Sequence, residues 1–398
     1  MLSAWVLQNE GFTGHEGHAK ERIVALSSGK QAILRECTRS DFYRTDKTRM
    51  TNEFAQGTLS RRTLLLGAAM SSAWQAFAKE TSENAVSAET TPTDPGKLKI
   101  CVFSKHLQWA SISDAASIAR DIGFDGVDIT VRAGGHVLPE RVETDLPAAV
   151  EAVHRAGLQV PMITSDIMSV DTPHADAVLR TASQLGIHYY RWGWLTYPVD
   201  KGIAERLDEL KPQVKALAEL NQKHQICGMY HTHSGPGLVG APVWDLWALF
   251  QGLDPRWVGV NYDIGHATVE GGYGGWIDSS RLVMNQMRGI ALKDFLWQKN
   301  SGKDAHTDPY GKSLGIADAW VPHWCPSGQG MVNFAGFFGL VKANGRFSGP
   351  VQLHFEYPGL GGAENGKTTL TVPKQAVIDA MRRDLTYVRK VMSEKELI

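Results

Sequence analysis

From residue 97 onward, the sequence alternates between short runs rich in apolar and β-branched residues and longer amphipathic stretches with helical spacing. The short runs, which we expect to be strands, cover residues 98–103, 127–131, 158–164, 187–192, 226–231, 258–263, 289–294 and 351–356. The helical stretches cover residues 113–121, 146–156, 175–185, 203–225, 244–253, 279–286, 334–343 and 374–391. Strands that alternate with helices are joined by right-handed crossovers into a parallel sheet, so the chain is predicted to be an α/β protein.

Two parallel architectures fit this alternation, and the loop after the first strand discriminates between them. A doubly wound open sheet carries a Gly-rich phosphate-binding turn there, whereas this chain has Phe103-Ser104-Lys105-His106-Leu107. A (β/α)8 TIM barrel takes about 250 residues plus insertions, which fits residues 97–393. We therefore predict a single-domain TIM barrel in which the first and last strands lie side by side.

The first 96 residues have the character of an export signal and a linker. Arg61 and Arg62 directly precede an apolar run, and small residues follow as far as Ala78. This order is typical of a secretory signal, and the paired arginines resemble the twin-arginine class. We expect residues 50–78 to be a twin-arginine signal peptide, residues 1–49 a mis-called upstream extension and residues 79–96 a linker. The mature chain is then periplasmic or extracellular; the alternative is an N-terminal helix of the folded domain.

Composition excludes several classes of protein. The 398 residues are 43% hydrophobic and 21% charged, with a net charge of -1, which argues against disorder and against a polybasic nucleic-acid partner. No apolar stretch reaches the roughly 18 to 20 residues of a spanning helix, so we expect no membrane span in the mature chain. The cysteines stand singly, at Cys37, Cys101, Cys227 and Cys325, which encodes neither a disulfide framework nor a structural zinc site.

Ionisable side chains stand at the C-terminal ends of the predicted strands, where TIM barrels carry their chemistry. They include Lys105, His106, Asp128, Asp166, Arg191, His231, His233, Asp263, His266, Lys293, Asp294 and Glu356. This pattern predicts a convergent polar pocket for a small molecule. The carboxylates and imidazoles among these residues form a mixed oxygen and nitrogen set that suits Mn, Mg, Co or Zn.

Five motifs resemble those of the xylose isomerase-like TIM barrels, a superfamily of sugar phosphate isomerases, epimerases and endonuclease IV-like enzymes. They are Tyr230-His231-Thr232-His233, Val260-Asn261-Tyr262-Asp263-Ile264-Gly265-His266, Ala291-Leu292-Lys293-Asp294-Phe295, Gly328-Gln329-Gly330-Met331-Val332-Asn333-Phe334 and His354-Phe355-Glu356-Tyr357-Pro358. The resemblance covers residues 97–393, and the exported twin-arginine form resembles secreted members of the superfamily. It implies a carbohydrate as the small-molecule partner.

The resemblance also implies a divalent metal, because better-known members hold one with four side chains after strands five to eight. Asp263 and Glu356 match the family's strand-six Asp and strand-eight Glu, and His231 stands where the strand-five Glu is expected. The implied ligands are therefore Asp263, Glu356 and His231. Ala291 stands where the strand-seven His is expected, so substitute ligands such as His233, or loss of the metal, remain open.

The family's chemistry is proton transfer next to a carbonyl group through an enediolate. The resemblance implies that Glu356 is the base, with a pKa that burial raises, that His231 or His266 is the acid, and that Lys293 stabilises the oxyanion. The expected substrate contacts are Asp128, His136, Arg191, His233 and Asp294.

The leading interpretation is thus a secreted sugar or keto-sugar isomerase or epimerase. One alternative is a keto-sugar or inosose dehydratase (lyase), because the Y-H-x-H motif also resembles inosose dehydratases. Another is a non-catalytic sugar-binding barrel, because of Ala291.

Overall fold

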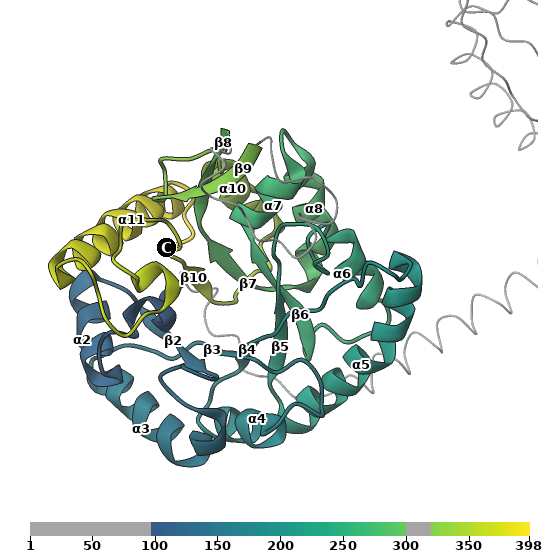
Figure 1. The fold of residues 1–398 in the computed structure, drawn as a ribbon, viewed down its shortest axis with the longest axis horizontal. Helices are drawn as coiled ribbons and strands as arrows, with labels where there is room; N and C mark the ends of the chain where they lie inside the picture. Colours follow the sequence, from purple (N-terminus) through teal and green to yellow (C-terminus); the bar gives the residue numbers. More distant parts are fainter. Residues whose placement is uncertain (1–96, 300–319) are drawn as a thin grey trace, which may run out of the picture. The chain divides into compact units, whose positions relative to one another are not determined.

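The computed structural model describes residues 97–299 and 320–398. Eight parallel strands form a closed barrel in the order β1-β10-β7-β6-β5-β4-β3-β2, and helices surround it (Figure 1). The barrel strands are β1 (Ile100–Phe103), β2 (Gly126–Val131), β3 (Ile163–Ser165), β4 (Tyr189–Trp192), β5 (Cys227–His231), β6 (Val258–Asp263), β7 (Met287–Leu292) and β10 (Val351–Leu353). Ile100 pairs with Val351, so β1 and β10 close the barrel and the predicted TIM fold is confirmed.

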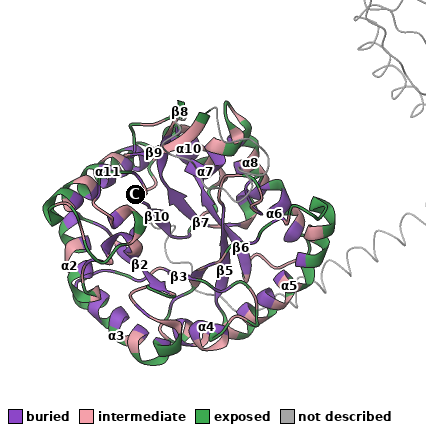
Figure 2. Ribbon diagram, in the orientation of Figure 1, coloured by how far each residue is buried: buried purple, intermediate pink, exposed green. Residues whose placement is uncertain are grey.

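The helices bury one face against the strands and expose the other (Figure 2). They are α2 (Ile112–Ile122), α3 (Val142–Arg155), α4 (Ala175–Gln184), α5 (Ile203–His224), α6 (Trp244–Leu249), α7 (Ile264–Gly271), α8 (Gly275–Val283), α10 (Phe334–Asn344) and α11 (Lys374–Glu394). In α2, the Ser111 hydroxyl accepts the Asp114 backbone N–H at the start, and Gly123, with φ of 107°, ends the helix. These two caps fix where α2 begins and ends.

Two features between β6 and α10 differ from the predicted alternation. Helix α7 starts directly after β6, because the Asp263 carboxylate accepts the His266 backbone N–H and caps it. The apolar run that we predicted as one strand, 289–294, ends at Leu292, and Asp294 begins a separate strand. That strand, β8 (Asp294–Lys299), pairs antiparallel with β9 (Trp320–Cys325) beside the barrel.

The predicted upstream extension, signal peptide and linker, residues 1–96, lie outside the described residues. In the described part of the chain, no helix combines the length and the apolar character needed to cross a membrane. Cys101, Cys227 and Cys325 are buried, and each is a free thiol.

Candidate active site

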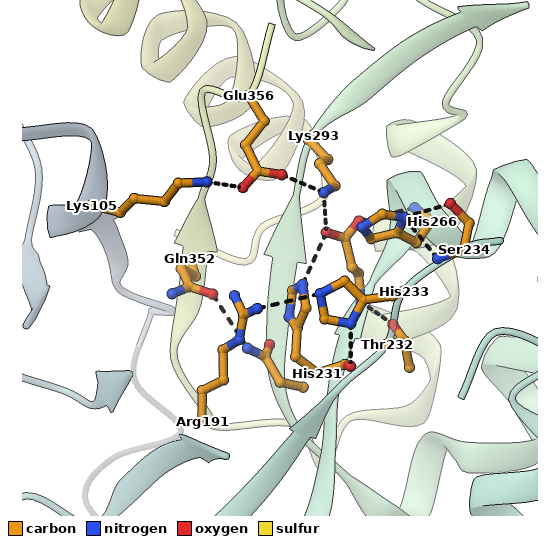
Figure 3. A network of polar contacts seen from close by, with 12 residues as sticks. Lys105, Arg191, His231, Thr232, His233, Ser234, His266, Lys293, Gln352 and Glu356 are labelled. Carbon is orange, nitrogen blue, oxygen red and sulfur yellow. Dashed lines mark hydrogen bonds and ion pairs between the residues drawn. The ribbon is translucent and has the colours of Figure 1, made fainter. Parts of the chain in front are cut away.

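Polar side chains from four neighbouring strands meet at the C-terminal end of the barrel (Figure 3). His231 and Asp263 are the last residues of β5 and β6, Lys293 directly follows β7, and Glu356 follows β10. His231, Asp263 and Lys293 are 1%, 0% and 4% exposed. The structure therefore brings together four of the predicted site residues, three of them buried and Glu356 partly exposed.

Glu356 is held between two lysine ammonium groups. Its Oε2 lies 2.6 Å from Lys293 Nζ, and its Oε1 lies 2.7 Å from Lys105 Nζ. Lys105 reaches Glu356 because β1 and β10 are neighbours at the barrel closure. Burial alone would raise the pKa of the Glu356 carboxyl, but the charges of Lys293 and Lys105 outweigh burial and hold it well below its usual range. The expected upward shift is thus wrong, and Glu356 is ionised at neutral pH.

Asp263 lies on the other side of Lys293. Its Oδ1 accepts the His266 backbone N–H at 3.1 Å, and its Oδ2 lies 3.6 Å from both Lys293 Nζ and His231 Nε2. Burial raises the pKa of Asp263 to about 6, although the Lys293 charge opposes this shift. The Lys293 ammonium therefore sits between two carboxylates, within 2.6 Å of one and 3.6 Å of the other.

The hydrogen bonds of His266 and His233 fix where their ring protons lie. His266 Nδ1 accepts the Ser234 backbone N–H at 3.0 Å, so a neutral His266 carries its proton on Nε2. His233 Nδ1 donates to the His231 carbonyl at 3.1 Å, and its Nε2 faces Arg191 Nη2 at 3.4 Å. Burial lowers the pKa of His266 and of His233 well below the usual range, so both rings are neutral at pH 7.

Three buried side chains have the donor atoms of a metal centre. His231, Asp263 and His354 each offer one ligand atom, and these atoms lie within 4.8 Å of one another. Asp263 Oδ2 and both ring nitrogens of His354 have no hydrogen-bond partner among the described residues. Buried polar atoms are normally paired, so this unmatched set fits a divalent ion with an open position for substrate.

A second group, His231, His233 and His266, is less suited to an ion. It offers three imidazoles and no carboxylate, and His266 Nδ1 and His233 Nδ1 are already bonded to Ser234 and to the His231 carbonyl. Glu356, which we predicted as a ligand, belongs to neither group, because both of its oxygens face lysines. His354 stands in the candidate group in its place.

Asp294 has a structural position and does not face the cluster. Its Oδ1 accepts the backbone N–H groups of Phe295 and Val332, at 2.9 and 3.0 Å. Its Oδ2 accepts those of Gly328 and Gly330, both at 2.9 Å. A Cβ on Gly330 would lie 2.2 Å from Asp294 Oδ1, so glycine is required there. Asp294, which we predicted as a substrate contact, instead holds the loop before α10 in place through these hydrogen bonds.

The remaining predicted contacts divide between the barrel interior and a loop. Asp128 is fully buried in β2, accepts the Thr164 hydroxyl at 2.7 Å, and has its pKa raised by burial to about 7. Arg191, in β4, contacts His233 at the cluster. His136 lies in the loop after β2, where its Nε2 is bonded to the Ala110 carbonyl at 3.3 Å, and it does not join the cluster.

Sequence reasoning placed Lys105 in the predicted pocket without a role there, and it assigned no place in the site to His354 or Trp324. Lys105 follows β1, and the predicted closure of the barrel beside the last strand was a signal for its contact with Glu356. His354 stands two residues before Glu356 inside one of the quoted motifs. Trp324 comes from the unpredicted β9, and its ring lies 4.2 Å from Lys293 Nζ. No spacing in the sequence indicates that contact.

Comparison with protein families identifies the class. The family model described as "Xylose isomerase-like TIM barrel" matches residues 116–380, and the chain belongs to this family. The comparison with curated proteins gives no match.

Three solved structures with the same fold share 12–14% sequence identity with this chain. A probable 3-DHS dehydratase from Bacillus anthracis is 14% identical, with a TM-score of 0.52 over 73% of this chain and 99% of its own. D-Psicose 3-epimerase from Clostridium cellulolyticum H10, solved with D-tagatose, is 12% identical, with a TM-score of 0.51 over 74% and 99%. The 3-keto-D-glucoside 4-epimerase from E. coli is 12% identical, with a TM-score of 0.50 over 74% and 100%. At these identities, the likenesses show that the chain shares its fold with these proteins.

Proposed function

We propose that this protein is an isomerase or epimerase of a sugar or keto-sugar and works by proton transfer next to a carbonyl group. The observation that carries the proposal is the Lys293 ammonium, 2.6 Å from an ionised Glu356 at the catalytic end of a barrel of this family. An ionised carboxylate beside a fixed cation is the pair needed to remove a C–H proton and stabilise the resulting oxyanion.

Glu356 is the proposed base. It takes the proton from the carbon next to the carbonyl, and the electron pair of that bond moves to form the enediolate. Lys293 then donates a hydrogen bond to the enediolate oxygen, where negative charge develops. The two lysines lower the basicity of Glu356, but they also guarantee that it is ionised when substrate arrives.

His266 is the proposed acid. Its Nδ1 is held by Ser234, so its proton is on Nε2, which has no partner among the described residues. A buried N–H without a partner costs free energy, and a sugar hydroxyl or the enediolate would satisfy it. Return of the proton to the other carbon gives an isomer, and return to the opposite face of the same carbon gives an epimer.

His231, Asp263 and His354 would hold a divalent ion, whose chemistry there is to polarise a sugar carbonyl group. Their neutral imidazole and carboxylate donors fit Mn, Co or Zn better than Mg, which prefers oxygen ligands.

The unpartnered His266 N–H also favours a second candidate, a dehydratase. The same enediolate would then expel a hydroxyl group, which takes the His266 proton and leaves as water. A non-catalytic sugar-binding barrel would leave the Lys293–Glu356 pair without a role.

One NMR experiment separates these functions. The protein is incubated with a panel of ketoses and 3-keto-glycosides, with and without added Mn²⁺, and products are identified by ¹³C NMR. We expect a new isomer or epimer with the same elemental composition. An unsaturated product that has lost water indicates the dehydratase, and recovery of every sugar unchanged contradicts the proposed enzyme.

We also propose that the chain is exported by the twin-arginine route and processed after Ala78. This rests on the Arg61-Arg62 pair and the A-x-A site at residues 76–78. N-terminal sequencing of the native protein is expected to begin at Lys79. A mature protein that retains Arg61 contradicts export.

A further inference from the structure

Two arginines at the mouth of the barrel lie over the same aromatic ring. The guanidinium carbon of Arg132, just after β2, is 5.5 Å from the centre of the Phe103 ring, and that of Arg191, in β4, is 5.6 Å from it. Within residues 97–299 and 320–398, neither guanidinium forms an ion pair with a carboxylate. By contrast, Arg141 and Arg180 each pair with an acidic residue on the surface.

Two carboxylates near these arginines have other partners, although Asp128 Oδ1 has none among the described residues. Glu356 is bound by two lysines, and Asp128 accepts a hydrogen bond from Thr164 and another from the Gln352 amide. Burial is the main cause that lowers the pKa of Arg191 to about 10; the Arg132 charge adds to this shift and the Glu356 charge opposes it. The mouth of the barrel therefore holds two like charges whose mutual repulsion no described carboxylate relieves by direct contact.

The arginine pair borders the candidate metal centre. The Phe103 ring that both guanidinium groups approach also packs against the His354 ring, at 5.0 Å between centroids. Arg191 further contacts His233, whose ring lies 4.6 Å from the His231 ring. A group bound by the arginines would thus lie beside the residues that we assign to proton transfer and metal binding.

Guanidinium groups present planar pairs of N–H donors that match carboxylate and phosphate oxygens. We propose that Arg132 and Arg191 form an anion subsite, and that the substrate is a sugar acid or a sugar phosphate and not a neutral sugar. The sugar part of this inference rests on the proposed function; the anion part rests on the unpaired arginines. A bound anion would remove the repulsion between them and would fix one end of the substrate relative to Glu356.

Calorimetric binding of three probes tests the subsite without requiring turnover. The probes are D-glucose, D-glucuronate and D-glucose 6-phosphate, which share a pyranose ring and differ in charge at C6. They are titrated into wild type, Arg132→Gln, Arg191→Gln and Arg191→Lys. Arg155→Gln is the matched control, because Arg155 is exposed on α3 and its loss changes the net charge equally. Circular dichroism checks that each variant is folded.

We expect at least one anionic probe to bind about tenfold or more tightly than glucose, and each Arg→Gln change to remove this advantage. Preference for glucuronate identifies a carboxylate, and preference for glucose 6-phosphate identifies a phosphate. Arg191→Lys keeps the charge but loses the planar fork, so it should retain only part of the advantage; Arg155→Gln should retain all of it.

Equal binding of the three probes, or no binding of any, overturns the subsite, as does an anion preference that survives both Arg→Gln changes. Anion binding without turnover of any sugar leaves the subsite intact and contradicts the proposed function, so the two failures are distinguishable.

Discussion

Glu356 and Asp294 are two carboxylates at the same end of the barrel, and their partners differ in kind. Glu356 faces two side-chain ammonium groups, Lys105 and Lys293. Asp294 accepts four backbone N–H groups, two on each oxygen. Flexible side chains can turn to a substrate, whereas backbone N–H groups move only if the loop moves. A strand-end carboxylate is therefore informative about chemistry only when its partners are known.

The same distinction separates the histidines. His106, just after β1, accepts the Phe355 backbone N–H on one ring nitrogen and bonds the Ala363 carbonyl with the other, so it ties β1 to the loop after β10. His354 has no hydrogen-bond partner in the described chain for either nitrogen. Both ring nitrogens of His106 therefore make structural hydrogen bonds, whereas those of His354 are available to bind a ligand.

The largest effect should come from Glu356→Gln, which keeps the shape of the side chain but removes the base. We expect kcat to fall by about 10²- to 10⁴-fold, the range of general base catalysis, while the protein stays folded with a lower melting temperature, because Lys293 loses a counter-charge. Steady-state kinetics on the responding sugar and a thermal melt check both. Glu151→Gln, on the exposed face of α3, is the control and should keep full activity. Wild-type activity in Glu356→Gln would show that Glu356 is not the base.

His354→Ala should weaken metal binding by more than about 100-fold, because it deletes a direct ligand. His233→Ala is the matched control, since His233 bonds to the His231 carbonyl and faces Arg191. Titration with Mn²⁺, Co²⁺ and Zn²⁺ measures both. Loss of metal binding in His233→Ala but not in His354→Ala would show that the metal is bound by the group that contains His233 and His266.

Asp294→Asn should destabilise the fold by about 2 kcal/mol, because the new NH₂ group opposes two backbone N–H donors. Chemical denaturation measures the loss. At temperatures well below its melting point, kcat should stay within tenfold of wild type. Asp278→Asn, an exposed change on α8, should alter stability by less than about 0.5 kcal/mol. An unchanged stability of Asp294→Asn would show that the loop does not depend on this carboxylate.

Replacing Asp128 should have a smaller effect, on how the stability of the fold depends on pH. Burial raises its folded pKa from 3.8 to about 7, so the folded state favours the protonated form. As pH rises from about 4 to about 7, the unfolded chain releases this proton while the folded chain keeps it, so wild type should lose stability relative to Asp128→Asn by up to about 1 kcal/mol per pH unit. Denaturation of both proteins from pH 4 to pH 8, in chelator, gives the difference. Parallel curves would mean that Asp128 titrates normally.

The barrel was predictable from sequence because its signal is local and repeated. Each strand–helix unit carries its own periodicity, and the closure of β1 on β10 follows from the count. The β8–β9 pair was not predictable from sequence. Residues 289–294 form one continuous strand-like run, and only the pairing of β8 with β9 shows that a second strand begins at Asp294.

The site was predictable to the level of which strand ends converge. His231, Asp263, Lys293 and Glu356 come from β5, β6, β7 and β10 and meet as expected. The hydrogen-bond partners of the strand-end residues were not predictable. The sequence does not show, for example, that the Asp294 carboxylate accepts the backbone N–H groups of Gly328 and Gly330.

Solvent deuterium exchange tests the central claim, that Glu356 moves a proton held beside Lys293, most directly. Wild type, Glu356→Gln and Asp294→Asn are incubated in D₂O with the responding sugar, and deuterium at the carbon next to the carbonyl is measured by NMR. The account predicts incorporation by wild type and by folded Asp294→Asn, and none by Glu356→Gln. Conversion without any deuterium at that carbon, or incorporation by Glu356→Gln at the wild-type rate, would contradict it.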